Sequence, residues 1–445
     1  MQATQNRSNE LKILLSRLLT RSGDQAWDFA IPICLVGLFP SQFSLIAFLY
    51  LVSKLGSFVF QPWLAGFIDR WKRINTAILG TGLQLASVLG VTICIFQLSK
   101  LADAQTALWR QPQLWPLLAS VTLGTIVGNL GSGLMDIAVG KDWIPVLVAK
   151  ERLPKVNSQL QTLDLLTEVL SPVIAGLILA QMAQFRDLTG LGIIAAWNVV
   201  SFVPEILLLG SVFKSSALLQ ESVGIEVSSR EGLIEKTKLG WKMFSKQSTA
   251  PVMTANALLW ISALSPHGVL LTGFLKSGWN LPETTLGIFR GLGAVFGLLA
   301  TVVFPWVHAR LGLVPTTRLF IIFQALMVLL SLPFFHMETA GGIAFLGLVL
   351  MSRIGLYGFC LGETEIRQRW IPQGQRGQVN GVAGALTSFA TIVLFGLGSL
   401  LGDKDNFIFM IAVSILSVVA GAALFLRWSI TDPQPEKSLE PVETK

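Results

Sequence analysis

Long apolar segments recur along the whole chain, and they constrain its fold more than any other feature. Runs of roughly 18 or more mostly apolar residues lie near 9–38, 43–69, 74–98, 115–140, 155–182, 189–213, 248–276, 283–309, 315–335, 340–366, 378–402 and 407–428. Hydrophobic residues make up 52% of the sequence and charged residues only 13%, a composition typical of polytopic membrane proteins. Because backbone groups in a bilayer must be satisfied within each segment, the sequence predicts an all-α fold of about twelve transmembrane helices.

The one substantial hydrophilic insertion, residues 214–247, separates these segments into two sets of six. We therefore predict an amino-terminal lobe over 1–213 with helices one to six, and a cytoplasmic linker over 214–247. A carboxy-terminal lobe with helices seven to twelve follows over 248–428, and a cytoplasmic tail over 429–445. Two six-helix lobes joined by a central loop are typical of the major facilitator superfamily, whose substrate sites lie near the midplane between the lobes.

Basic residues predict the orientation in the membrane. They are concentrated in alternate loops, as Arg70, Lys72 and Arg73 after helix two and Lys141, Lys150, Arg152 and Lys155 after helix four. The positive-inside rule then places both termini in the cytoplasm of a multi-pass protein of the cell (inner) membrane. The net charge of +7 is explained by this bias and implies contact with anionic lipid, whereas a soluble basic face for nucleic acid is missing. We expect a monomer.

Asp24 is the first candidate for a substrate ligand, because a carboxylate inside a transmembrane helix costs about 2.5 kcal/mol or more and usually serves a pathway or partner. Helical spacing places Thr20 and Asp28 on the same face of helix one. Helix six carries a second polar stripe, formed by Asn198, Ser201, Phe202 and Glu205. Helix three contributes Gln84, and helix five a stripe over 157–168. Hydrogen bonds that hold helices together are the alternative for each stripe, but a carboxylate with hydroxyl and amide oxygens suits hard cations.

Helix seven contains the sequence SPHG at 265–268, where Pro266 and Gly268 predict a break beside His267. Broken transmembrane helices free backbone carbonyls, and imidazole is a common ligand of transition metals. His267 is therefore a second candidate metal ligand, with a structural hydrogen bond as the alternative.

The short loop between helices two and three reads GFIDRWKR at 66–73. Its acid and bases, Asp69, Arg70 and Arg73, have the position and character of the loop motif that closes the cytoplasmic face of facilitator proteins through ion pairs. A positive-inside loop with one accidental acid is the alternative.

Together these segments resemble the ferroportin family, solute carrier family 40, and its bacterial members in particular. The resemblance covers nearly the whole chain and rests on GDQAWDFA at 23–30, KDWIPVLVAKERL at 141–153, NSQLQTLDLLTEVLSPVIAGLI at 157–178, AWNVVSFVPE at 196–205, RIGLYGF at 353–359 and RGQVNGV at 376–382. It implies a metal site at Asp24, Thr20, Asn198, Ser201 and Phe202, and calcium-binding residues at Asp24, Gln84, Asn198 and Glu205. It also implies a cytoplasmic gate of Asp69, Arg73, Asp142, Asn157 and Arg376.

The sequence departs from the vertebrate members of that family at their second metal site. Those members have a histidine where Asp28 stands, and they pair a cysteine in helix seven with a histidine in helix eleven. Helix eleven contains no histidine in this chain, so any carboxy-lobe site would depend on His267. Sensitivity to the peptide hormone hepcidin is not expected.

The resemblance implies a transporter that exports divalent metal ions, Fe²⁺ above all, by alternating access. Proton coupling through Asp24 or Glu205 and modulation by Ca²⁺ are further expectations, and no resident cofactor is expected. An exporter of small organic or cationic compounds is the alternative. The sequence contains no HExxH, nucleophile elbow or Walker loop, so an enzyme is not predicted.

Overall fold

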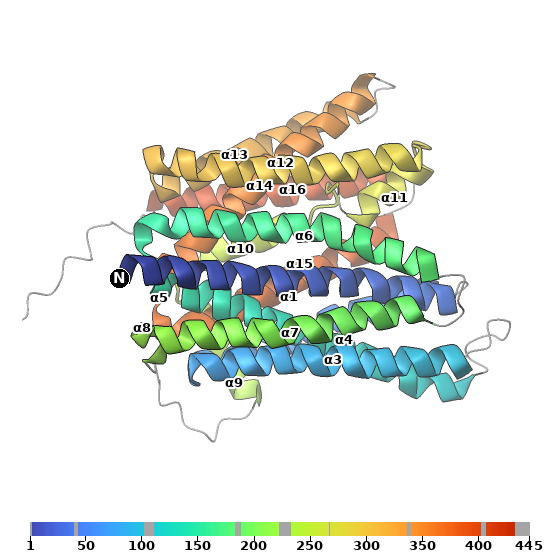
Figure 1. Cartoon of the computed structure of the whole chain (residues 1–445). Coiled ribbons are helices and arrows are strands. Elements are labelled where there is room, and N and C mark those ends of the chain that lie inside the picture. The colour runs from blue at the N-terminus through green and yellow to red at the C-terminus, as the bar shows by residue number, and fades with distance from the viewer. Residues whose placement is uncertain are drawn as a thin grey trace, which may run out of the picture.

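The computed structural model describes residues 2–39, 43–101, 111–182, 188–221, 233–266, 268–335, 340–401 and 406–431, and in these ranges all regular structure is helical. The helices run side by side along one direction and form a bundle (Figure 1). The predicted all-α class is therefore confirmed, and the helix boundaries fall within a few residues of most predicted ones.

The amino-terminal half contains six long helical segments. They are α1 (Gln2–Leu38), α2 (Phe43–Ala65), α3 (Arg73–Leu101), α4 (Trp115–Met135), α6 (Leu153–Met182) and α7 (Thr189–Ser215). Helix α1 runs through this half with α6 on one side and α7 on the other (Figure 1). A π-helical segment, η3 (Asp136–Trp143), and the short α5 (Ile144–Leu147) continue α4. The sequence predicted helix over 115–140 but gave no sign of the π-helical turn.

The carboxy-terminal half contains α10 (Ala250–Leu259), α11 (Val269–Ser277), α12 (Glu283–Leu311), α13 (Leu313–Ser331), α14 (Ala340–Trp370), α15 (Arg376–Leu401) and α16 (Phe407–Thr431). The predicted seventh segment is divided into α10 and α11 by residues 260–268, which are not helical where described. Pro266 and Gly268 lie in this interruption, as the sequence indicated. His267 lies outside the described residues.

Two helix pairs make the most extensive contacts between the halves. Helix α2 packs against α15, and α6 packs against α12, so each half contributes its second and fifth spans to the contact between lobes. The amphipathic helix α9 (Leu233–Ser245), in the predicted linker, lies against both α2 and α15. Its Trp241 and Phe244 pack with Val379 and Val382 of α15. The described part of the linker therefore touches both lobes at the same end of the bundle.

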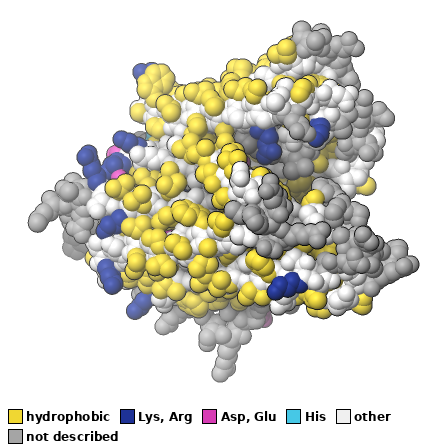
Figure 2. Space-filling view, turned by 45° about the vertical axis from the view of Figure 1, so that its right-hand side comes forward, with side chains coloured by type: hydrophobic (Ala, Val, Ile, Leu, Met, Phe, Trp, Pro, Cys, Tyr) yellow, Lys and Arg dark blue, Asp and Glu magenta, His cyan; other side chains and the backbone are white. Residues whose placement is uncertain are grey.

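The surface is suited to a bilayer. Nine of the described helical segments are long and apolar enough to cross a membrane. Helix α1 is not among them, since even its last 18 residues contain Arg21, Asp24 and Asp28. Hydrophobic side chains cover the middle of the face in Figure 2, and most Lys and Arg side chains on that face gather toward its left edge.

Candidate functional site

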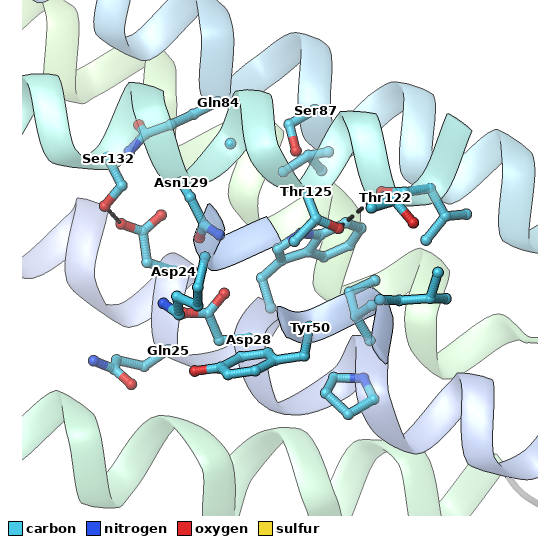
Figure 3. A pocket seen from close by; sticks show the side chains of 18 of the residues that line it. Asp24, Gln25, Asp28, Tyr50, Gln84, Ser87, Thr122, Thr125, Asn129 and Ser132 are labelled. Carbon is cyan, nitrogen blue, oxygen red and sulfur yellow. Dashed lines mark hydrogen bonds between the residues drawn. The ribbon is translucent and has the colours of Figure 1, made fainter. Parts of the chain in front are cut away.

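A cavity of about 260 Å³ with both polar and apolar lining residues lies within the amino-terminal half, between α1, α2, α3 and α4. Its polar lining consists of Arg21, Asp24, Gln25, Asp28, Tyr50, Lys54, Gln84, Ser87, Thr122, Thr125, Asn129 and Ser132. Asp24 and Asp28 project from α1 toward Asn129 and Ser132 of α4 (Figure 3). The cavity therefore brings two carboxylates together with amide and hydroxyl oxygens, which is the ligand chemistry of hard cations.

Asp24 keeps one face open to this cavity. Ser132 Oγ donates a hydrogen bond of 2.7 Å to Asp24 Oδ2. Arg21 Nη1 lies 4.0 Å from the same oxygen, and the Asp24 side chain is 16% exposed. The carboxylate is thus held by a neutral donor and approached by a cation, without a close ion pair between Arg21 and Asp24.

Asp28 lies one helical turn after Asp24 and lines the same cavity. The sequence placed it on the face of Asp24, but the predicted metal site did not include it. Lys54 is its basic neighbour in the lining, and Lys54 Nζ lies 5.2 Å from the centre of the Tyr50 ring. The i to i+4 spacing on α1 was the signal that could have added Asp28 to the site.

Gln84 and Glu205 are buried with unsatisfied polar atoms. Gln84 is 3% exposed and Glu205 1%, and neither the amide atoms of Gln84 nor the carboxylate oxygens of Glu205 have a hydrogen-bond partner among the described residues. Thr20 lies close enough to Glu205 to interact with it, but the Thr20 hydroxyl directs its hydrogen to the Ser16 carbonyl at 2.9 Å. Buried polar atoms are normally paired, so these two side chains call for a ligand or water.

The remaining residues of the predicted metal site lie on α7, behind the backbone of α1. Asn198 Nδ2 donates to the Gly23 and Ile194 carbonyls at 3.3 and 3.0 Å, and a Cβ on Gly23 would lie 2.5 Å from Asn198 Oδ1. Ser201 Oγ donates to the Asn198 carbonyl at 2.8 Å. Phe202 belongs to a buried apolar cluster. Asp24 and Gln84 therefore line the cavity, whereas Thr20, Asn198, Ser201, Phe202 and Glu205 do not.

One end of the bundle is closed by buried charges, and we call it the gate end. Arg73 Nε donates to Asp142 Oδ2 at 2.7 Å, and Arg376 Nη1 lies 3.6 Å from Asp142 Oδ1. All three side chains are buried. Asp142 thus joins an arginine of its own lobe to an arginine of the other lobe.

Asp69 closes the same end in a way that the sequence did not reveal. Its two oxygens accept hydrogen bonds of 2.8 Å from the backbone N–H groups of Gly377 and Gln378, in the first turn of α15. A carboxylate at a helix amino terminus is favourable because that end carries partial positive charge. A Cβ on Gly377 would lie 2.2 Å from the Ala65 carbonyl, so glycine allows α2 and α15 to approach this closely. Burial raises the pKa of Asp69 to about 7, although the two N–H groups act in the opposite direction.

A reciprocal amide pair forms the third gate contact. Asn157 Nδ2 donates to Gln368 Oε1 at 2.7 Å, and Gln368 Nε2 donates back to Asn157 Oδ1 at 3.0 Å. Further contacts cross between the halves, among them those from Lys141 Nζ to Thr364 Oγ1 at 2.9 Å and from Arg369 Nη2 to the Lys150 carbonyl at 3.0 Å. The sequence predicted Asn157 but missed its partners, because glutamine, threonine and carbonyl acceptors carry no distinctive pattern.

Within the described residues, no group of three or more His, Cys, Asp or Glu side chains is arranged to hold a metal ion. A metal at Asp24 would therefore depend on neutral oxygens as well. In the interruption between α10 and α11, Arg353 Nη2 donates to the Leu264 carbonyl at 2.7 Å, so one freed carbonyl is already engaged. The predicted role of His267 lies outside the described residues.

Comparison with family models and comparison with known sequences both point to the same family. The ferroportin model, described as Ferroportin1 (FPN1), matches residues 7–418. Ferreportin of Bdellovibrio bacteriovorus is 42% identical over 422 residues, which cover 94% of each protein.

Comparison with solved structures shows which conformation this structure resembles. A bacterial homologue of the iron transporter ferroportin in its outward-facing state is 40% identical, covers 95% of this chain and 99% of its own, and superposes with a TM-score of 0.86. An inward-facing structure, also 40% identical and covering 95% and 98%, gives only 0.65. The proton:xylose symporter XylE, at 15% identity, 96% coverage of both chains and a TM-score of 0.69, shares the fold alone. The chain thus has a major facilitator fold in a form closer to the outward-facing homologue, and it is a polytopic membrane transporter that belongs to the ferroportin family.

Proposed function

We propose that this transporter exports divalent metal ions, with Fe²⁺ as the favoured substrate, and that Asp24 is the charged ligand of the transported ion. The observation that carries this proposal is the cavity in which Asp24 and Asp28 face amide and hydroxyl oxygens of α3 and α4. The iron-transporter homologue with 40% identity supports iron as the substrate. Because oxygen ligands do not select one first-row metal, Co²⁺ and Mn²⁺ should also be carried.

The side chains around Asp24 have different proposed roles in binding the ion. Asp24 supplies the fixed charge, Asp28 a second carboxylate one turn away, and Ser132 a hydroxyl that already contacts Asp24. Asn198 and Ser201 lie on α7, against the other side of α1. Asn198 Nδ2 donates to the Gly23 carbonyl of α1, whereas the Ser201 hydroxyl donates within α7, to the Asn198 carbonyl. We therefore assign Asn198 first to positioning α1, and both residues to coordination only in a form of the protein in which α1 and α7 separate.

Alternating access would open the gate end while closing the opposite end around the ion. In the present form Asp142, Asp69 and Asn157 connect the lobes at the gate end. We assign this end to the cytoplasm, since the loops after the second and fourth spans bring their basic residues there. Both termini would then be cytoplasmic and the membrane would be the bacterial inner membrane.

We also propose a regulatory Ca²⁺ site formed by Asp24, Gln84, Asn198 and Glu205. Asp24 and Gln84 line the cavity whereas Asn198 and Glu205 do not, so the four would meet around a cation only in a form in which α1 and α7 separate. The support for this site is that Gln84 and Glu205 are buried polar side chains with unsatisfied atoms. Asn198 uses its Nδ2 for two carbonyls, which leaves Oδ1 as its coordinating atom. Calcium prefers such carboxylate and amide oxygens. Glu205 or Asp24 would carry the coupled proton if transport responds to an imposed pH gradient.

Metal uptake into proteoliposomes tests the main proposal. Asp24→Asn keeps the size of the side chain but removes the charge. We expect it to reduce Fe²⁺ and Co²⁺ flux at least about 100-fold, since Asp28 would be left as the one carboxylate among the described residues of the cavity lining. Glu151→Gln is the matched control, because it removes an exposed carboxylate at the gate end and should leave flux unchanged. Near-normal flux through Asp24→Asn, or transport of organic cations without metals by the wild type, would overturn the proposal.

A further inference from the structure

Arg21 stands between two groups of carboxylates. Its Nη2 lies 3.2 Å from Asp136 Oδ1 and its Nε 3.3 Å from Asp164 Oδ1. Its Nη1 lies 4.0 Å from Asp24 Oδ2. A single guanidinium is therefore shared between two carboxylates outside the proposed coordination set and the carboxylate assigned to the transported ion.

Arg17 binds the same two carboxylates, Asp136 and Asp164, but it makes no close contact with Asp24. It donates to both oxygens of Asp164, at 2.8 and 2.7 Å, and to Asp136 at 2.8 Å. Two arginines and two aspartates thus form a cluster without net charge, and Asp24 is a fifth, additional charge at its border. Arg21 already has carboxylate partners without Asp24, so it can retreat from Asp24 without losing all of its ion pairs.

A metal ion on Asp24 would compete with Arg21 for the same oxygen. Divalent ions bind oxygen ligands at about 2.0–2.6 Å, which would place two positive charges a few ångströms from the guanidinium. Even at the dielectric constant of water, repulsion at roughly 4 Å between such charges changes a binding constant by about tenfold or more.

We propose that Arg21 is a tethered competitor of the transported metal, a positioning residue that weakens the Asp24 site so that the ion is released. This inference rests on the proposed function. The structure has the gate end closed, which is the state in which an exporter must give up its ion. Arg21 approaches Asp24 in this state while Asp136 and Asp164 hold the rest of its guanidinium. The residue would trade affinity for rate of release.

Two substitutions in the same cluster should act in opposite directions. Arg21→Gln removes the competitor and should tighten Co²⁺ binding, measured by calorimetry, about tenfold. Asp136→Asn removes one of the carboxylates that hold Arg21 away from Asp24, and it should weaken Co²⁺ binding several-fold. Both variants lose ion pairs of one cluster and should lower the melting temperature, so a purely structural effect would change binding in one direction only.

Transport kinetics provide the second measurement. In proteoliposomes, Arg21→Gln should lower both the KM for Co²⁺ and the maximal rate, since tighter binding slows release. Arg21→Lys keeps a positive charge but loses the guanidinium fork that Arg21 directs at Asp24, Asp136 and Asp164, so its Co²⁺ affinity should lie between those of the wild type and Arg21→Gln.

The proposal is overturned if Arg21→Gln binds Co²⁺ no more tightly than the wild type while Asp24→Asn has lost binding. If the wild type and Asp24→Asn bind Co²⁺ equally, or neither binds it, the metal site itself is wrong and the inference falls with it. Equal tightening in Arg21→Gln and Asp136→Asn would also exclude the competitor role.

Discussion

The gate end and the Asp24 cavity both bury polar side chains inside an apolar bundle, but they satisfy them differently. At the gate end, Asp142 lies between Arg73 and Arg376, and Asp69 accepts two backbone N–H groups. Beside the cavity, the buried atoms of Gln84 and Glu205 have no hydrogen-bond partner among the described residues.

This difference indicates that the gate end holds the two lobes together, whereas the cavity is suited to binding a ligand. Buried polar groups that find partners within the protein hold two elements in one arrangement, because separating them leaves charges unpaired. Buried polar groups without partners destabilise the protein through their desolvation, and a ligand that pairs with them removes this penalty. The gate end is therefore expected to respond to mutation by changing conformation, and the cavity by changing its affinity for cations.

The largest effect is expected at Asp142. Asp142→Asn would leave two buried guanidinium groups, Arg73 and Arg376, without their shared carboxylate, and breaking a buried ion pair in this way costs about 3–5 kcal/mol. We expect the closed gate to become a minor state. Spin labels at residues 151 and 373, which are exposed on opposite lobes of the gate end, should report longer distances once the three native cysteines are replaced.

Glu151→Gln is the control for Asp142→Asn, because it removes an exposed carboxylate at the same end. Since residue 151 carries a label in the first pair, this control needs a second pair of label positions. An unchanged distance distribution in Asp142→Asn would mean that the buried charges do not hold the gate closed.

A smaller effect, dependent on pH, is expected at Asp69. Burial raises its pKa to about 7 in the closed gate, whereas an exposed aspartate has a pKa of about 3.9. The closed form therefore binds a proton more readily than the open form. Closure is most favourable near pH 4 and loses stability as the pH rises to about 7, where the closed-state carboxyl also ionises. The short-distance population of the same spin labels should fall between pH 5 and pH 8.

Asp69→Asn should remove this dependence on pH, because it has no proton to lose in that range. A wild type whose distances do not change with pH, or an Asp69→Asn variant that keeps the same change, would show that another group is responsible.

The smallest effect is expected at Glu205. It should change the affinity for a cation rather than the conformation of the gate. Glu205→Gln should weaken Ca²⁺ binding, measured by calorimetry, about tenfold, because a charged ligand becomes neutral. Without Ca²⁺ the same variant should melt at an unchanged or higher temperature, since a buried carboxyl without an ion-pair partner is replaced by an uncharged amide.

Glu363→Gln provides the contrast for Glu205. Glu363 is also buried, but it forms an ion pair of 2.7 Å with Arg367, so its substitution should lower the melting temperature and leave Ca²⁺ affinity unchanged. If Glu205→Gln is as destabilising as Glu363→Gln, then Glu205 has a partner within the protein and the contrast between the two regions fails.

Much of the fold could be predicted from the sequence, because a bilayer allows few solutions. A segment such as 407–428 must form a helix to satisfy its backbone, and the structure has α16 at Phe407–Thr431. Pro266 and Gly268 also indicated the interruption between α10 and α11. The π-helical segment Asp136–Trp143 could not be predicted, because its sequence fits an ordinary helix equally well.

The candidate site was less accessible to sequence reasoning. Asp24 could be identified because a carboxylate at membrane depth is costly wherever it points. Helical spacing placed Thr20 and Asp28 on the same face, but it could not show that Asp28 lines the cavity while Thr20 does not. Residues four apart on a helix are offset by about 40°, so a stripe of three drifts around the helix. The structure accordingly directs Thr20 toward Glu205 of α7 and Asp28 into the cavity beside α4.

The sequence by itself determined the helical spans, the two sets of six and the presence of a charge at depth, because each depends on local composition and the needs of the backbone. The tertiary structure alone decided which polar atoms are satisfied. Asp69 accepts hydrogen bonds from the first turn of α15, 308 residues away along the chain. Gln84 has no hydrogen-bond partner among the described residues, and Glu205 has only the Thr20 hydroxyl beside it. Hydrogen bonds depend on atoms brought within about 3 Å, and only the packing of distant helices brings those atoms together.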